Sequence, residues 1–380
     1  FPSRFTSVRH PRWSCRKRGP GGFAAVAMAI LLPVVIGAVG LAVDEGRVVL
    51  AHSRIQTAVD AAALTGTPHA QAATLFVPGT GSTKPHATAA VSLSWLDGNR
   101  FGADPVQCLC DSNEYPAVLG PGVGQASIDQ GTEAAVRRLL ANPDIDTVVA
   151  GSQGTRVAWN AASDPRLAGR TLHLWLYSDM NTKTGLAARF PGQEIPTTGV
   201  KGGVPTGPTD PNVDVTSISQ EWDPISHFPK YAITYLWTLP AAALGFWTAH
   251  GALADPSSPL GIDYDGATVT KSGNVTTITL RSQLTPYGQL AVIAVNAIAG
   301  PQAAFVTKTL LRPVDDVVAG ILNLGGKDVD GPMAFAPTPQ FALRTLAKGF
   351  EKAARDLAAI PAVLKAGPKP VSTPPPTAVP

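Results

Sequence analysis

The sequence predicts an α/β protein with a central, mostly parallel sheet that is preceded by a single transmembrane helix. Between residues 72 and 325, apolar strand-like runs alternate with helical ones, which is the pattern of βαβ units. Within that stretch, TVVAGSQGTRVA places a serine between a strand and a helix. Ahead of it, the 21 residues from Phe23 to Val43 carry no charge, and as a helix they would cross roughly 30 Å of hydrocarbon.

Charge and composition exclude some classes of protein. Of the 380 residues, 44% are hydrophobic and 15% are charged, so the chain can bury a sizeable core. Six of the basic residues and no acidic one lie in residues 1–22, so the rest of the chain has 24 basic and 27 acidic side chains. The main body is therefore slightly acidic, which argues against nucleic acid as a partner.

The three cysteines, Cys15, Cys108 and Cys110, are too few for a disulfide scaffold or a four-thiolate metal site. Cysteines one residue apart rarely bridge each other, so all three are predicted to be ordinary thiols. No cofactor or metal is predicted.

The uncharged segment from Phe23 to Val43 is predicted to span the membrane. The cations in residues 1–22 precede it and Asp44 and Glu45 follow it, an asymmetry that keeps the basic end in the cytoplasm. A cleaved signal peptide is the alternative.

Residues 44–66 continue at helical spacing. GGFAAVAMAILLPVVIGAVGLAVDEGR and IQTAVDAAALTG resemble the N-terminal segment of TadE/TadG-like Flp pilus-assembly proteins, which implies a membrane anchor with the C-terminal bulk outside the cytoplasm.

The elements of the main body follow in order. The sequence predicts strands over 73–81, 146–151 and 173–179, and helices over 126–143 and 154–162. Ligands of parallel sheets bind beyond the carboxyl ends of the strands. This edge is where the loop Gly79-Thr80-Gly81, Ser152 and Asp179 are expected.

Ser152 has the sequence context of a nucleophile elbow. Small residues at Ala150, Gly151 and Gly154 permit the strained turn that lifts a serine clear of the sheet and aims the N–H of Gln153 at an oxyanion. Ala150 stands where the G-x-S-x-G pattern has its first glycine. A phosphate-binding loop is the alternative, but the sequence lacks the lysine of G-x-x-x-x-G-K-[ST].

A serine nucleophile needs a base and an acid, and in this fold they follow it in the order acid, then histidine. His250, after an apolar run, is the candidate base, and Asp223 is the candidate acid. His227 lies only four residues from Asp223, which favours a local turn contact. The N–H of Thr80 is the second candidate oxyanion donor, although an ordinary glycine turn explains that loop equally well.

Several segments in register resemble the mycobacterial PE-PPE C-terminal domain over about 75–325. They are EYPAVLGPGVGQASIDQGTEAAVRRL, VAGSQGTRVAW, TGLAARFPGQEIPTTG, EWDPISHFPKY, AAALGFWTAHGAL and LLRPVDDVV. The resemblance implies a cutinase-like serine α/β-hydrolase in which Ser152 is the nucleophile, Asp223 the acid and His250 the base. Family members commonly have a Pro/Asn/Gly-rich loop where this chain has SDMNTKTG, which leaves Asp179 as an alternative acid.

The resemblance also implies an acyl ester as the substrate. Acyl transfer onto an envelope glycolipid is one alternative to hydrolysis, and a non-catalytic scaffold for pilus assembly or the envelope is the other.

The remaining segments complete the predicted organisation. The apolar stretch 228–253 is predicted to be a lid-like helical region, with Trp237, Phe246 and Trp247 along an acyl chain; a second membrane span is the alternative. A hairpin is predicted over 262–280. The pairs Asp263/Asp265 and Asp315/Asp316 are predicted to be solvated turn acids rather than glycosidase carboxylates or calcium ligands.

The predicted regions are a basic cytoplasmic segment (1–22), the membrane helix with its extension (23–66), a hydrolase domain (72–325) and a helical, Pro-rich tail (326–380).

Overall fold

The computed structural model describes residues 73–80, 107–203, 210–250 and 263–368. The predicted membrane helix, its extension to residue 66, Cys15, Gly81 and the Pro-rich tail lie outside the described residues.

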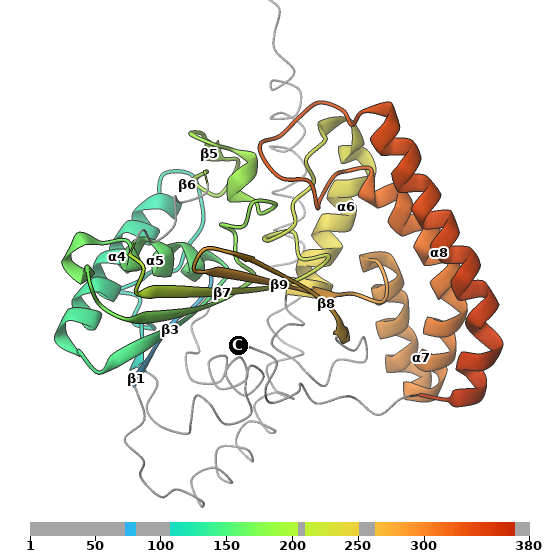
Figure 1. Ribbon diagram of the computed structural model, residues 1–380, viewed down its shortest axis with the longest axis horizontal. Helices are drawn as coiled ribbons and strands as arrows, with labels where there is room; N and C mark the ends of the chain where they lie inside the picture. Colours follow the sequence, from blue (N-terminus) through green and yellow to red (C-terminus); the bar gives the residue numbers. More distant parts are fainter. Residues whose placement is uncertain (1–72, 81–106, 204–209, 251–262, 369–380) are drawn as a thin grey trace, which may run out of the picture.

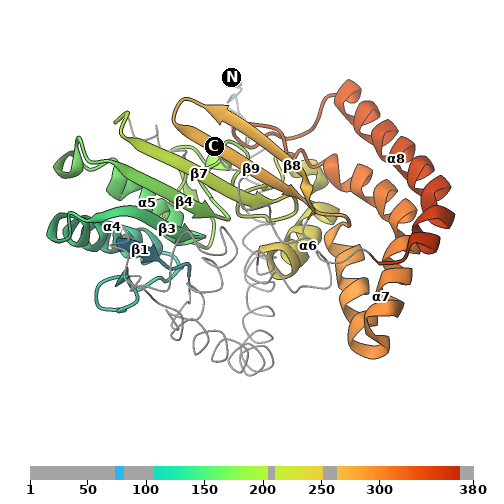
Figure 2. The same cartoon turned by 60° about the horizontal axis from the view of Figure 1, so that its bottom comes forward.

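A seven-stranded sheet forms the centre of the molecule, in the order β2-β1-β3-β4-β7-β9-β8 (Figures 1 and 2). Neighbouring strands pair in parallel except at the edge, where β8 runs antiparallel to β9. The strands are β1 (Ala73–Val77), β2 (Gln107–Cys108), β3 (Ile145–Gly151), β4 (Leu172–Tyr177), β7 (Val213–Gln220), β8 (Asp263–Ser272) and β9 (Val275–Arg281). The prediction of an α/β fold with a mostly parallel sheet is confirmed.

Strand β4 illustrates why the central strands are almost continuously apolar. Leu172, Leu174 and Leu176 belong to the core on one side of the sheet, whereas Trp175 and Tyr177 belong to a separate cluster on the other. Successive side chains of a strand point to opposite faces, and both faces are covered in parallel sheets. LHLWLY is therefore buried along its length except at His173.

Helices α4 (Gly124–Ala141) and α5 (Gln153–Ala162) contribute to the larger core and flank the sheet at one end of the molecule (Figures 1 and 2). Both lie within two residues of their predicted bounds. Helix α6 (Tyr235–Gly245) and a π-helix (Phe246–His250) follow β7. The minor elements are η1 (Pro165–Leu167), η2 (Ala187–Arg189), η3 (Ala232–Thr234) and the antiparallel pair β5 (Glu194–Ile195) and β6 (Val200–Lys201).

Two long helices, α7 (Pro286–Asn323) and α8 (Pro339–Ala366), form the opposite end of the molecule from α4 and α5 (Figures 1 and 2). They run antiparallel and approach each other at two glycines: a Cβ added to Gly349 would lie 2.9 Å from the Cα of Gly320. Gly300, with φ 81° and ψ 178°, interrupts the helical backbone of α7.

The prediction that the paired aspartates are solvated turn acids is wrong. Asp263 and Asp265 lie in strand β8. Asp315 and Asp316 lie in α7 and are 7% and 2% exposed. Asp315 accepts hydrogen bonds from the N–H (2.6 Å) and the hydroxyl (2.5 Å) of Thr285, and Asp316 pairs with Lys352 of α8. Asp316 thus joins α7 to α8, whereas Asp315 binds the residue that caps the start of α7 itself.

The fully buried Arg189 attaches the α7–α8 loop to the body of the molecule. Its guanidinium donates to the carbonyls of Phe228 (2.9 Å), Val329 (2.7 Å) and Gly331 (2.6 Å). Longer bonds reach the carbonyls of Gly326 and Lys327. Five carbonyls thus take the place of water around one cation.

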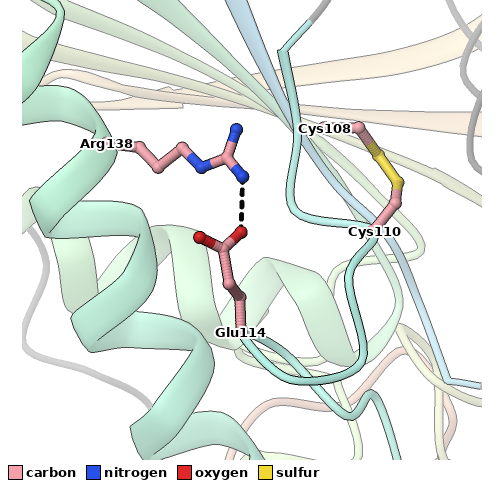
Figure 3. Close-up of a disulfide and its surroundings, with 4 residues drawn as sticks. All are labelled: Cys108, Cys110, Glu114 and Arg138. Carbon is pink, nitrogen blue, oxygen red and sulfur yellow. Dashed lines mark hydrogen bonds and ion pairs between the residues drawn. A yellow bond between two sulfur atoms is a disulfide. The ribbon is translucent and has the colours of Figure 1, made fainter.

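The cysteines at 108 and 110 form a disulfide, so the prediction of free thiols is wrong for this pair (Figure 3). The chain bends directly after β2 and brings the two Cα atoms to 5.1 Å, an ordinary separation for bridged cysteines. Close by, an ion pair between Glu114 and Arg138 ties the following loop to α4 (Figure 3).

Candidate active site

Ser152 occupies a strained turn between β3 and α5. Its backbone has φ 51° and ψ −121°, a combination that is costly for any residue with a side chain. The turn is held by a hydrogen bond from its N–H to the carbonyl of Tyr177 (2.9 Å) and by the hydroxyl of Thr155, which donates to the carbonyl of Ser152 (2.6 Å). Ser152 is half-buried at the carboxyl edge of the sheet.

The neighbouring glycines explain how the chain fits around this turn. A Cβ on Gly154 would lie 2.5 Å from the carbonyl oxygens of Val77 and Pro78, so only glycine lets α5 approach β1 this closely. A Cβ on Gly79 would lie 3.0 Å from the Cβ of Ser152. At Gly151, in contrast, the space is open among the described residues. Gly154 is therefore the small residue that the turn requires, and Gly79 lies directly against the serine.

Asp223 and His250 are joined by a hydrogen bond of 3.0 Å between Oδ1 and Nδ1. Asp223 follows β7 and is 0% exposed, and its Oδ1 also accepts from the N–H of Ile225 (3.0 Å). His250 ends the π-helix and remains partly exposed, at 16% of its side chain. Gly245 makes this contact possible, because a Cβ there would lie 2.2 Å from the carbonyl of Trp222.

Asp223 is ionised despite its burial. Burial alone would raise the pKa of its carboxyl. The charge of His250 and hydrogen bonds from His250, Ser178 and the Ile225 N–H together outweigh burial and hold that pKa below its ordinary value. Ser178, with φ 52°, directly follows β4 and was not anticipated from the sequence, because a lone serine after a strand carries no distinctive signal.

The ring of Phe246 stacks on the imidazole of His250, with centroids 4.7 Å apart and an interplanar angle of 15°. Both rings belong to the π-helix, a rare conformation that is often found at functional sites. Phe246 is 39% exposed, so one of the aromatic residues predicted to line an acyl chain lies at the surface beside the histidine. Trp237 and Trp247 are half-buried.

Asp179 has a different set of partners. Its carboxylate accepts from the N–H (2.9 Å) and side-chain amide (2.8 Å) of Asn181 and from the indole of Trp159 (3.3 Å). It is 1% exposed, and burial raises its pKa above the ordinary value because these donors only partly compensate. The hydrogen bond of His250 thus goes to Asp223 and not to Asp179.

His227 contacts Asp223 only through the backbone, where its N–H donates to the carbonyl of Asp223 (2.8 Å), and its imidazole has other partners. Its Nε2 lies 3.0 Å from the hydroxyl of Ser219, and its Nδ1 lies 3.3 Å from Oδ1 of Asp328. The three form a second Ser-His-Asp chain. Ser219 is 1% exposed inside β7, so a substrate carbonyl cannot reach its hydroxyl.

Gln153 connects the serine turn to the loop after β1. Its side chain accepts a hydrogen bond from the hydroxyl of Thr80 (3.0 Å) and donates one to the carbonyl of Val118 (2.9 Å). Gln153 is also the first residue of α5, and the first N–H groups of a helix have no partner within it. The Gln153 side chain therefore ties the loop of Gly79 and Thr80 to the serine turn.

The sheet order places these groups along one edge. Ser152 follows β3 and Asp223 follows β7, with β4 between them, and all three strands are parallel. The serine turn and the Asp223–His250 pair are therefore separated by one strand.

Comparison with known proteins gives two family matches. The PE-PPE domain family matches residues 114–312, and the Flp pilus-assembly TadE/G-like family matches residues 21–73. The uncharacterised PPE family protein PPE28 of Mycobacterium tuberculosis is 27% identical over 199 residues, which are 49% of this chain and 30% of the relative. The chain thus spans about a third of the length of this relative. No solved structure matches.

Proposed function

Because this chain belongs to the PE-PPE domain family, whose fold is α/β-hydrolase-like, we propose that it is a serine esterase that hydrolyses acyl esters through an acyl-enzyme. The observation that carries the proposal is the 3.0 Å hydrogen bond between Asp223 and His250, one strand away from a serine with the backbone of a nucleophile elbow. Backbone strain of this kind persists only where surrounding contacts hold the residue in place, and strained residues cluster at active sites.

The proposed acylation follows from the chemistry of the pair. With Nδ1 of His250 bound to the Asp223 carboxylate, the opposite nitrogen Nε2 is the one that takes the proton of the Ser152 hydroxyl. The serine oxygen then bonds to the ester carbonyl carbon. Asp223 remains ionised and stabilises the imidazolium that forms, and the N–H groups of Gln153 and Thr80 donate to the tetrahedral oxyanion.

Collapse of that intermediate releases the alcohol, which takes the proton from His250, and leaves the acyl group on Ser152. Water then attacks the acyl-enzyme by the same steps in reverse order. A sugar hydroxyl of an envelope glycolipid in place of water would make the same intermediate an acyl donor. Hydrolysis and transfer therefore share one set of catalytic residues and differ in the acceptor.

We place the esterase outside the cytoplasm, anchored by residues 23–43. The TadE/G-like match covers this uncharged segment. The Cys108–Cys110 disulfide agrees with an oxidising compartment, where such bonds persist.

The test uses the full chain in a mild detergent. It should hydrolyse nitrophenyl esters of short or medium acyl chains and be labelled by a fluorophosphonate, and Ser152→Ala should abolish both. Ser163→Ala is the matched control, because Ser163 lies at the other end of α5 and is exposed. Its hydrolysis and labelling should equal those of the unaltered protein.

Labelling that survives Ser152→Ala would refute the nucleophile. Inactivity of the unaltered, folded chain on every ester tested would favour the non-catalytic scaffold. Adding a sugar alcohol separates the two catalytic outcomes, because transfer diverts the acyl group to the sugar without raising the release of free acid.

A further inference from the structure

One side of the α7–α8 hairpin exposes a row of large apolar side chains. They are between 41% and 70% exposed, well above the exposure of core residues: Leu310, Val314, Ile321, Leu343, Phe350 and Leu357. We call these six residues the apolar hairpin face. Scattered apolar side chains are normal at protein surfaces, but a contiguous set marks an interaction site.

The helical geometry places all six residues on the same side of the hairpin. At about 100° per residue, the α8 members lie roughly 80–120° around the helix from Gly349, and the α7 members lie roughly 80–120° in the same sense from Gly320. Gly320 and Gly349 are where the two helices touch. Because the helices are antiparallel, equal rotations in the same sense bring both rows to one side of the pair.

The charged side chains of the hairpin lie on the other side. Arg344, Lys348 and Arg355 are roughly 100–140° from Gly349 in the opposite sense, and all three are exposed. Along its described length, α8 has five basic and two acidic residues. The hairpin thus has an apolar side and a basic side, the composition of helices that lie in a membrane surface.

We propose that the apolar hairpin face lies in the surface of an anionic lipid bilayer. Among the described helices, only α7 is long and apolar enough to cross a membrane by length and composition. The excess of basic residues on α8 favours anionic lipid over a second copy of this chain, because two such helices would repel each other. This contact does not depend on catalysis.

The contact would also orient the proposed active site. Trp222, Ala249 and Leu322 share one apolar cluster, so α7 packs directly against the segment that ends in His250. A hairpin held in the bilayer surface would therefore hold that segment beside the lipid.

The experiment uses the full chain inserted in lipid nanodiscs that contain phosphatidylglycerol and phosphatidylcholine. Benzoylphenylalanine, a photo-crosslinker, replaces Phe350 in one variant and Arg344 in the other, which lies on the opposite side of the same helix. After illumination, mass spectrometry measures the lipid adducts of each variant. We expect on the order of tenfold more adduct at position 350, because only the apolar side reaches the acyl region.

Pure phosphatidylcholine discs test the role of charge, and the adduct yield at position 350 should fall in them. The double variant Leu343→Glu/Leu357→Glu should lower the yield at 350 while leaving hydrolysis of a soluble nitrophenyl ester unchanged, which shows that the domain is still folded. Equal adduct at positions 344 and 350, or crosslinks that join two chains in place of lipid, would overturn the proposal. An equal yield in neutral discs would overturn the preference for anionic lipid.

Discussion

Ser152 can adopt its strained backbone because the residues around it are packed to fit. Gly154 is the tightest of these positions, since a methyl group there would meet two carbonyl oxygens of the β1 segment at 2.5 Å. We expect Gly154→Ala to lower the free energy of unfolding by about 1–3 kcal/mol, because α5 must shift away from the sheet. Chemical denaturation monitored by circular dichroism measures the change.

Gly151→Ala is the matched control for that substitution. The space beside Gly151 is open among the described residues and its φ is not positive, so alanine fits without strain. Stability should stay the same or rise by about 0.4–1 kcal/mol. Equal losses in the two variants would contradict the steric explanation of the turn.

Asp223 and Asp179 follow neighbouring strands, and His250 is hydrogen-bonded to Asp223. We expect Asp223→Asn to lower kcat by about 10³–10⁴-fold, because an amide no longer holds the imidazole in the right tautomer or stabilises its charge. Asp179→Asn should have a much smaller effect on kcat, since Asp179 contacts Asn181 and Trp159 instead. Steady-state ester hydrolysis compares the two, and a larger loss at Asp179 would transfer the orienting role to it.

At the scale of elements, the contact between α7 and α8 depends on one buried carboxylate. Burial, with the help of the neighbouring Asp356, raises the pKa of Asp316 to about 6, although Lys352 lowers it. Lys352→Met should lower the free energy of unfolding by about 1–3 kcal/mol, because the carboxylate loses its cation while it stays buried. In a thermal denaturation series, Asp316→Asn/Lys352→Met should be more stable than Lys352→Met alone.

The exposed pair Glu351–Arg355 provides the control for the Asp316 and Lys352 variants. It is an i,i+4 ion pair with side chains that are 69% and 63% exposed. Replacing both by glutamine should change stability by less than about 0.5 kcal/mol. A loss as large as that of Lys352→Met would show that charge on α8 in general, and not the buried carboxylate, stabilises the hairpin.

Whether an element could be predicted depended on how regular its sequence is. The β8–β9 hairpin has clear alternation and turn residues, and the structure has it within a residue of the predicted bounds. Helix α8 lies inside the tail that was predicted to be helical. Strand β7, VDVTSISQ, was missed because its aspartate and two serines are typical of turns, and it is stabilised by pairing with β4 and β9. Helix α7 was missed because Gly300-Pro301 and Pro313 are typical helix breakers.

At the scale of the molecule, the candidate site combines segments that are far apart in the sequence. The strand-serine-helix pattern around Ser152 is local and could be read directly. The pairing of Asp223 with His250, in contrast, depends on how α6 passes the end of β7 at Gly245, which no local pattern encodes. The second Ser-His-Asp chain was not anticipated for the same reason, because Asp328 lies about 100 residues from His227. The disulfide was missed for a local reason, since cysteines one residue apart rarely bridge.

The buried carboxyls of Asp223 and Asp179 should make the free energy of unfolding depend on pH in opposite directions. The pKa of Asp223 is lowered, so its contribution is present above the ordinary value of 3.8 and is lost as pH falls through the folded-state pKa. The pKa of Asp179 is raised, so its contribution is present below 3.8 and is lost as pH rises through the raised value.

The measurement is the free energy of unfolding from about pH 3 to pH 7. Compared with the unaltered protein, Asp179→Asn should lose less stability as pH rises above 3.8, and Asp223→Asn should lose less as pH falls below it. Parallel curves for the three proteins would contradict both assignments.

The Arg189 cluster sets a lower limit on the unit that can fold independently. The PE-PPE match ends at residue 312, yet four of the five carbonyls around this guanidinium belong to residues 326–331. A fragment cut at the family boundary would leave this buried cation with only the carbonyl of Phe228 among its five acceptors, so it should be degraded quickly by proteases. Recombinant work on this domain should therefore keep the chain beyond residue 331.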